Sequence, residues 1–186
     1  DRTPPRRDDK VLTSWNALTI SAFAKAAQVF DNEGYRRLAR EEMGRLLEPF
    51  TKTGSVVHSR WRGKASETVF LDDYAYLAQA LLDLYEADFE ADYLDQALAL
   101  MEVMFERFQG APGTAFRFTP EDRSSPLPAR LVLGEENVPS GNATALVALQ
   151  RLSLFGAAEK YRKRARAIID GLAGYLHSSA PSSPGL

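Results

Sequence analysis

The chain has 186 residues, so at roughly 150 residues per domain it is one domain or part of a larger one. Hydrophobic residues make up 45% and charged residues 26% of the sequence, a balance that is typical of globular chains and excludes disordered and collagen-like classes. The net charge of −2 disfavours a duplex-binding or membrane-surface protein, and the absence of Cys excludes disulfides, thiolate zinc sites and Cys nucleophiles. We therefore predict a cytoplasmic protein with no nucleic-acid or membrane partner, no resident metal and no cofactor.

Six segments have apolar residues at every third or fourth position, which is the pattern of amphipathic helices. In chain order they cover residues 12–30, 33–50, 69–87, 90–108, 139–155 and 158–176. Lys25 is the only charge in the first segment and Arg151 the only charge in the fifth, whereas the second and sixth carry broad charged faces. A helix without a charged face must be buried on most sides, so we predict that odd helices are inner and even helices outer.

Short links join each odd helix to the next even one, which predicts three antiparallel helical hairpins. The long connections, residues 51–68 and 109–138, then lie where the inner helices begin, and 55–61 and 114–119 within them resemble short strands. Repeated hairpins with an insertion on one face predict an all-α fold, part of an α/α toroid with inner-helix N-termini around a mouth. Acidic pairs recur at equal spacing near those N-termini: Asp8–Asp9, Asp72–Asp73 and Glu135–Glu136.

Three segments at the predicted mouth combine carboxylates, amides, hydroxyls and aromatic rings: DDKVLTSWN (8–16), FLDDYAYL (70–77) and ENVPSGN (136–142). Polar groups of this kind hydrogen-bond vicinal hydroxyls, aromatic faces stack on sugar rings, and carboxylates act as acid or base. A structural role is the alternative, because acidic residues at helix N-termini favour the helix dipole and Thr13 and Ser140 suit N-caps. Trp15 and Tyr74 would fit equally well in an apolar core.

We predict three catalytic candidates at the mouth, Asp73, Glu136 and His58. Asp73 can pair with Glu136 or Asp9 as acid and base, and His58 is the only His on the mouth side and the best neutral-pH base. A glycosidase needs two carboxylates about 5 Å apart for retention or about 6.5–9.5 Å apart for inversion. An oxygen-ligated Ca²⁺ at the acidic pairs is the one metal alternative. The predicted ligand-binding residues are Trp15, Asn16, Asp72, Tyr74, Arg60, Ser140 and Asn142.

The same segments, in full DDKVLTSWNALTISAFAKA, LDDYAYLAQALLDLYEA and VPSGNATALVALQRL, resemble the helical region of the YyaL/spermatogenesis-associated protein 20 family of DUF255-type, thioredoxin-domain-containing proteins. The resemblance spans about Asp8 to Leu152. It implies a six-hairpin glycosidase-like domain, an (α/α)6 toroid similar to N-acylglucosamine 2-epimerases, behind a thioredoxin-like domain. The chain has no Cys and no βαβ pattern, so the redox role of that domain is not carried over. Ala17 stands where Gly is expected, and Asp72 where Glu is expected.

Three hairpins are half of such a toroid, so we expect a middle-to-late piece of a longer protein, with residues 1–178 as the partial toroid and residues 179–186 as a flexible tail. The hypothesis is part of a carbohydrate-active domain, a sugar epimerase or glycoside hydrolase, that is inactive as an isolated fragment. Its expected partners are a carbohydrate-like small molecule and the remaining hairpins and thioredoxin-like domain of the parent chain. The alternative is a non-catalytic helical scaffold or interaction module, which as a fragment would form a homodimer.

Overall fold

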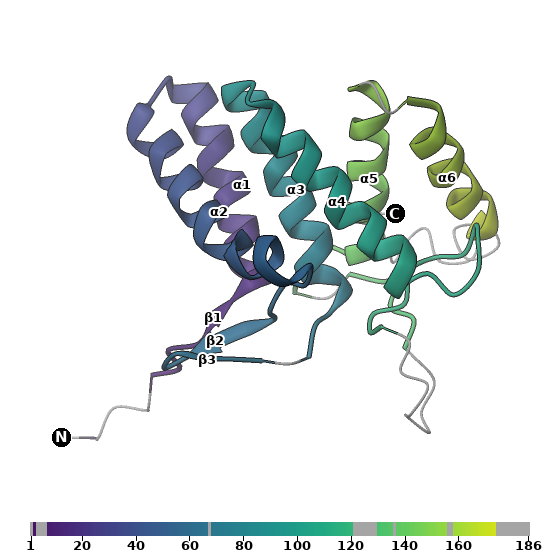
Figure 1. The fold of residues 1–186 in the computed structure, drawn as a ribbon, viewed down its shortest axis with the longest axis horizontal. Coiled ribbons are helices and arrows are strands. Elements are labelled where there is room, and N and C mark those ends of the chain that lie inside the picture. The colour runs from purple at the N-terminus through teal and green to yellow at the C-terminus, as the bar shows by residue number, and fades with distance from the viewer. Residues whose placement is uncertain are drawn as a thin grey trace.

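The computed structural model describes residue 2 and residues 7–66, 68–120, 130–135, 137–155 and 158–173. All six predicted helices are present within these residues, and they form three antiparallel hairpins (Figure 1). The helices are α1 (Thr13–Phe30), α2 (Glu33–Thr53), α3 (Leu71–Asp88), α4 (Ala91–Arg107), α5 (Gly141–Leu154) and α6 (Ala158–Gly171). A small sheet is formed by β1 (Val11–Leu12), β2 (Ser59–Trp61) and β3 (Lys64–Ala65).

The helices form an inner row and an outer row, as their charge patterns predict. In the inner row α3 lies between α1 and α5 and packs against both. In the outer row α2 covers α1, α4 covers α3 and α6 covers α5 (Figure 1). The inner helices all begin at the same end of the molecule, where the small sheet and the described parts of the two long connections also lie.

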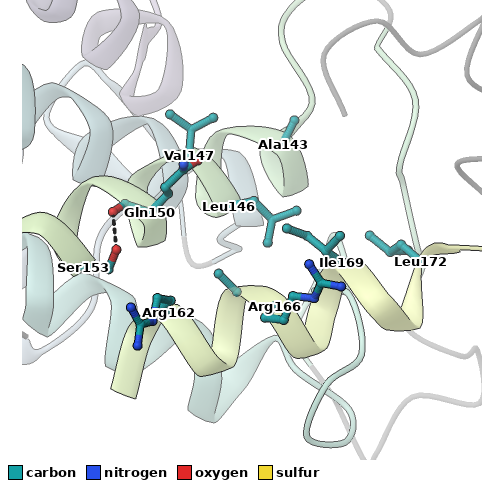
Figure 2. Close-up of a pocket in the computed structure, with 10 residues that line it drawn as sticks. Ala143, Leu146, Val147, Gln150, Ser153, Arg162, Arg166, Ile169 and Leu172 are labelled. Atoms are coloured by element: carbon teal, nitrogen blue, oxygen red, sulfur yellow. Dashed lines mark hydrogen bonds between the residues drawn. The ribbon is translucent and has the colours of Figure 1, made fainter. Parts of the chain in front are cut away.

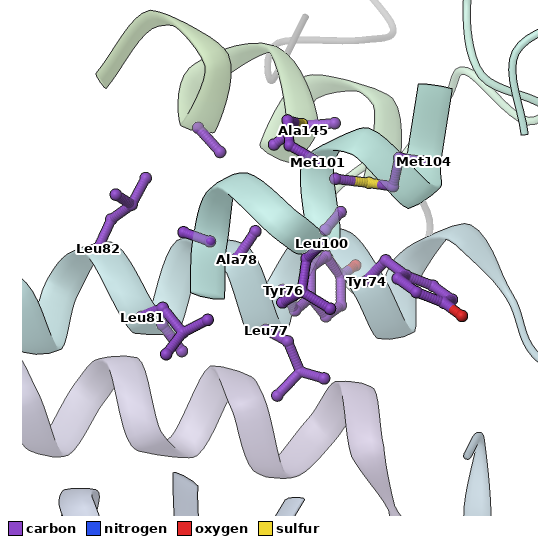
Figure 3. Packing of buried hydrophobic residues seen from close by; sticks show 14 of the residues in the cluster. Tyr74, Tyr76, Leu77, Ala78, Leu81, Leu82, Leu100, Met101, Met104 and Ala145 are labelled. Carbon is purple, nitrogen blue, oxygen red and sulfur yellow. The ribbon is translucent and has the colours of Figure 1, made fainter. Parts of the chain in front are cut away.

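Helix α3 fills the centre of the core because it has neighbours on three sides. Its side chains Tyr76, Leu77 and Leu81 are essentially fully buried, and Met101 of α4 and Ala145 of α5 pack in the same cluster (Figure 3). Full burial of each large apolar side chain stabilises the fold by about 1.5–3 kcal/mol. The packing of the central hairpin therefore fixes the position of the side chains at the ends of the inner helices.

The single charges of α1 and α5 meet on one buried carboxylate of α3. The Nζ atom of Lys25 lies 3.2 Å from Asp83 Oδ1, and an Arg151 guanidinium nitrogen lies 2.9 Å from the same atom. The Asp83 side chain has no exposed surface, so it requires such cationic partners. These two ion pairs join the three inner helices, and the sequence pattern did not predict them.

The predicted burial of the inner helices is confirmed for α3, whereas one flank each of α1 and α5 is exposed, as half a toroid requires. Trp15 and Val29 of α1 are 60% and 77% exposed, and Leu154 at the end of α5 is 77% exposed. The reason is that α1 and α5 each have an inner neighbour on one side only within the described residues. Both flanks are therefore apolar surfaces that a continued ring of hairpins would cover.

The N-cap of α1 and the end of α2 differ from the prediction. Thr13 is the first residue of α1 rather than its N-cap, because its hydroxyl donates to the carbonyl of Val57 in the connection. Ser140 is the predicted N-cap, with its hydroxyl accepting from the Ala143 N–H at 3.4 Å. Helix α2 continues to Thr53, beyond the predicted end, and stops at Gly54, whose φ of 72° is left-handed.

The predicted strands are found only in part. Of the segment 55–61, three residues form β2, which pairs antiparallel with β1 and β3. The strand predicted over 114–119 is wrong, because it contains a single bridge between Gln109 and Phe116. The backbone N–H and carbonyl of Phe116 bond instead to the side chain of Asn142. The predicted tail, residues 179–186, lies outside the described residues.

Candidate functional site

The two long connections are fixed to the first turns of the inner helices. The Thr13 N–H donates to the His58 carbonyl, and the Leu71 N–H donates to the Phe118 carbonyl, both at 2.9 Å. The Tyr76 hydroxyl donates to the carbonyl of Pro139, just before α5. We call this end, formed by the first turns of α1, α3 and α5 and by the described parts of residues 55–70 and 109–140, the mouth.

The imidazole of His58 is held by the buried carboxylate of Asp73. The His58 Nδ1 atom lies 3.1 and 3.2 Å from the two carboxylate oxygens, and the ring packs edge-on against Phe70 at 4.7 Å between centroids. Asp73 has no exposed surface and also accepts from the Phe70 N–H at 3.0 Å. With Nδ1–H directed at the carboxylate, Nε2 is the basic nitrogen, and the side chain of His58 stays 28% exposed.

Burial raises the pKa of the Asp73 carboxyl, while His58 and the backbone N–H groups of Phe70 and Ser14 act to lower it. The neighbouring Asp72 has a pKa raised to about 6, first by burial and then by the charge of Asp73. At near-neutral pH Asp72 can therefore exchange a proton, and Asp73 has no surface through which a ligand could reach it.

The start of α5 lies against the Asp72 side chain. A Cβ atom at Gly141 would meet the Asp72 Oδ1 atom at 2.2 Å, so only Gly allows this approach without a shift. The two adjacent carboxylates therefore have different surroundings. Asp73 contacts His58, and Asp72 contacts the first residue of α5.

Three of the predicted ligand-binding residues are buried supports of the mouth. Tyr74, Ser140 and Asn142 are 0%, 3% and 0% exposed. The Tyr74 hydroxyl lies 3.2 Å from Ser55 Oγ and 3.3 Å from an Arg107 guanidinium nitrogen. Such burial does not support direct ligand contact by these three side chains, because a ligand in the mouth cannot reach them.

Asn142 joins both described parts of the second long connection to α5. Its side-chain oxygen accepts from the Phe116 N–H at 2.8 Å, and its amide donates to the carbonyls of Phe116 and Val132 at 2.9 and 3.0 Å. The two bonds to Phe116 are buried and the one to Val132 is partly buried, so the fully buried side chain fixes the loop rather than binding a solute.

The other predicted binding residues keep some exposed surface. Trp15 projects from the first turn of α1, and Asn16 beside it donates to the Leu12 carbonyl at 2.8 Å. Arg60 lies half-buried in β2. Glu136 lies outside the described residues, so its pairing with Asp73 stays a prediction.

The carboxylate of Asp9, the other predicted partner of Asp73, pairs with Arg7 at 2.6 Å and is half exposed. In the described part of the chain, no three acidic or His side chains come together as a metal site would require. Within the same residues, no helix is long and apolar enough to cross a bilayer.

A separate apolar groove of about 350 Å³ lies between α5 and α6, and the sequence reasoning missed it (Figure 2). Leu146 and Val147 line it from α5, and Ile169 of α6 and Leu172 just beyond that helix line the other side. Its described lining includes Arg162 and Arg166 but neither a carboxylate nor a His. The groove therefore lacks acid–base chemistry and resembles a packing surface.

No family model matches the chain. Human spermatogenesis-associated protein 20 is 31% identical over 172 residues, which cover 83% of this chain and 21% of that protein. An uncharacterized protein of Caenorhabditis elegans is 28% identical over 187 residues, covering 95% of this chain and 25% of its own length. The chain is a distant homologue of spermatogenesis-associated protein 20. The resemblance drawn from its three segments is thus confirmed, and the chain spans a quarter or less of these relatives.

Solved structures with the same fold include two carbohydrate-active enzymes. Cellobiose 2-epimerase from Spirochaeta thermophila superposes with a TM-score of 0.71 at 14% identity, covering 91% of this chain and 45% of that one. A GH76 α-mannanase of Bacteroides thetaiotaomicron gives a TM-score of 0.72 at 14% identity, covering 95% and 47%. At such identities the likeness shows the fold alone. The three hairpins are part of an (α/α)6 toroid, as predicted.

Proposed function

We propose that the chain is part of a carbohydrate-active six-hairpin domain, whose mouth binds a sugar or sugar-like molecule and acts on it as an epimerase or a glycoside hydrolase. The observation that supports this most is the pair formed by His58 and Asp73 at the first turn of α3. A buried carboxylate that orients a partly exposed imidazole is an arrangement suited to proton transfer. The shared fold of sugar epimerases and mannosidases supports the substrate class.

The geometry suggests different roles for the adjacent carboxylates of Asp72 and Asp73. Asp73 is a positioning residue, because it is fully buried and acts through His58. His58 would remove a proton through Nε2, and Asp72 would supply or receive one, since its raised pKa allows both states near neutral pH. The sequence prediction assigned the direct contact with the substrate to Asp73, whereas this proposal assigns it to Asp72.

The chain covers less than half of the matching toroids, so we propose that the remaining hairpins of a parent chain complete the mouth. A thioredoxin-like domain of the parent is a further expected partner. The appropriate protein for functional tests is therefore the full-length parent, and we expect the 186-residue piece to be inactive.

A thermal-shift screen of the full-length protein against mono- and oligosaccharides tests the proposal, because a ligand that binds the folded state raises its melting temperature. We expect a saturable shift for one sugar class, which His58→Gln and Asp72→Asn reduce. The matched control is Glu41→Gln, which changes an exposed carboxylate of α2. If no sugar gives a shift, or if the two mouth variants behave like the control, the proposal is wrong.

A non-catalytic scaffold role is the second candidate function, and the exposed apolar flanks of α1 and α5 favour it.

We propose that neighbouring hairpins of the same ring cover the groove between α5 and α6, where Val147 is 48% exposed in this chain. Val147→Glu should then lower the melting temperature of the full-length protein and leave that of the 186-residue chain unchanged. Equal effects in the two proteins would contradict this packing, and a dimer of the shorter chain would identify a second copy as the occupant.

A further inference from the structure

The β2–β3 hairpin at the edge of the mouth carries three cations that form no ion pair with any described residue. These are Arg60, Arg62 and Lys64. The helices differ, because most of their Lys and Arg side chains pair with a carboxylate. Glu48 of α2 lies within electrostatic range of Arg60, but its carboxylate is already paired with Lys52 at 2.6 Å. Positive charge is thus available on this hairpin for a solute.

The turn of the hairpin places an Arg where the backbone disfavours one. Trp61 and Lys64 pair across the strands, so Arg62 and Gly63 are the two turn residues, with φ of 48° and 78°. Turns with two left-handed residues usually carry Asn, Asp or Gly at the first position. An Arg there strains the backbone, which points to a use for its side chain.

The Arg62 side chain lies over the aromatic ring of Trp61. Its guanidinium lies 4.8 Å from the centre of the Trp61 ring, and Trp61 is 45% exposed. A cation over an indole face is held in place without losing its charge. The pair therefore combines an apolar surface with a fixed positive group, which suits a ring-shaped ligand that carries an anion.

The hairpin is joined to the catalytic candidate through one strand. Val11 pairs with Arg60 and Leu12 with Ser59, and the Thr13 N–H continues this ladder by donating to the His58 carbonyl. Successive side chains of a strand point to opposite faces, so Trp61 and its cross-strand partner Lys64 lie on one face of the hairpin and Arg60 lies on the other. Figure 1 shows this sheet at the end where α1 begins.

From these observations we propose that the β2–β3 hairpin is a subsite for the anionic group of a charged sugar, either a carboxylate or a phosphate. Arg62 and Lys64 would bind the anion on the face that carries Trp61, because a guanidinium forms paired hydrogen bonds with either group and an ammonium adds a point charge. Trp61 would contact the sugar ring. The inference rests on the proposed function and narrows its substrate class to anionic sugars.

Binding by the full-length protein of three matched ligands tests the subsite: glucose, glucuronate and glucose 6-phosphate. We expect at least tenfold tighter binding of one anionic form than of glucose, and this advantage should shrink as salt screens the charges. Comparing glucuronate with glucose 6-phosphate identifies whether the hairpin prefers a carboxylate or a phosphate. The same series on mannose covers a second ring configuration.

Two variants locate the anion. Lys64→Gln and Arg62→Asn should each remove most of the advantage, and Asn is well suited to the left-handed turn position, so the urea midpoint should not fall. Arg37→Gln on the exposed face of α2 is the control. Equal binding of neutral and anionic sugars would overturn the subsite and leave the proposed function intact, whereas no binding of any sugar would overturn both. An advantage that persists in Lys64→Gln and Arg62→Asn would place the anion elsewhere and refute the proposal.

Discussion

The Asp72→Asn substitution should stabilise the protein at neutral pH while impairing its function. The Asp72 carboxyl has a pKa of about 6 in the folded chain against 3.8 as its ordinary value, mainly because it is partly buried. Since the folded-state pKa is the higher one, the native protein binds more protons than the unfolded chain between about pH 4 and 6. Stability therefore falls as the pH rises through that window, and Asn removes the loss.

The magnitude follows from the size of the shift. A displacement from 3.8 to about 6 corresponds to about 3 kcal/mol at pH 7, at 1.36 kcal/mol per unit of pKa. Part of the Asp72 side chain still contacts solvent, which screens the charge, so we expect about 1–1.5 kcal/mol of stabilisation. Below pH 4 both states are protonated in the original protein, and the gain should disappear.

Urea unfolding of the original and Asp72→Asn chains at pH 7.5 and pH 4 measures the difference. The matched control is Asp95→Asn on α4, whose side chain is exposed and should change stability little at either pH. A substitution that destabilises at pH 7.5, or a gain of equal size at both pH values, would show that burial of the Asp72 charge is not the cause of its raised pKa.

Three further predictions concern the same end of the molecule. Asp73→Asn should move the pKa of Asp72 back toward its ordinary value, because one of the charges that raise it is lost, and a ¹³C carboxyl titration would detect no change if that reasoning fails. Gly141→Ala should displace the Asp72 carboxyl and weaken sugar binding by the full-length protein, whereas Gly44→Ala, with nothing near its added carbon, should stabilise α2 by about 1 kcal/mol. Asn142→Ala should destabilise the chain by about 3 kcal/mol in urea unfolding, since two buried hydrogen bonds and a partly buried one lose their partner; a cost below 1 kcal/mol would mean that the loop does not depend on this side chain.

The helices and their two rows were predictable because both follow from local patterns. A periodicity near 3.6 residues defines each helix, and the scarcity of charge in α1 and α5 identifies them as inner helices. The sequence could not show that Lys25 and Arg151 share Asp83, because that contact joins three helices far apart along the chain. The exposed flanks of α1 and α5, by contrast, follow from the three hairpins read from the sequence, because half a toroid leaves the inner row without a neighbour at each end.

The site was predictable in composition but less so in geometry. The sequence placed His58 and the acidic pair at one end, and the structure brings His58 and Asp73 within hydrogen-bonding distance. It assigned Tyr74 and Asn142 to a ligand, yet a polar side chain at a mouth has the same sequence signature whether it faces a cavity or a loop backbone. Only the fold of the second connection distinguishes these cases, by bringing the Phe116 backbone to Asn142.

The acidic pair shows why adjacency in sequence is a poor guide to shared function in a helix. Successive residues of a helix are rotated by about 100°, so Asp72 and Asp73 cannot face the same surroundings. Asp73 faces His58 and is buried, whereas Asp72 faces the start of α5 and keeps contact with solvent. The two remain coupled, because the charge that holds His58 also raises the pKa of Asp72. In the proposed function, the Asp73 carboxylate would therefore orient His58 as the base and raise the pKa of Asp72 as the acid.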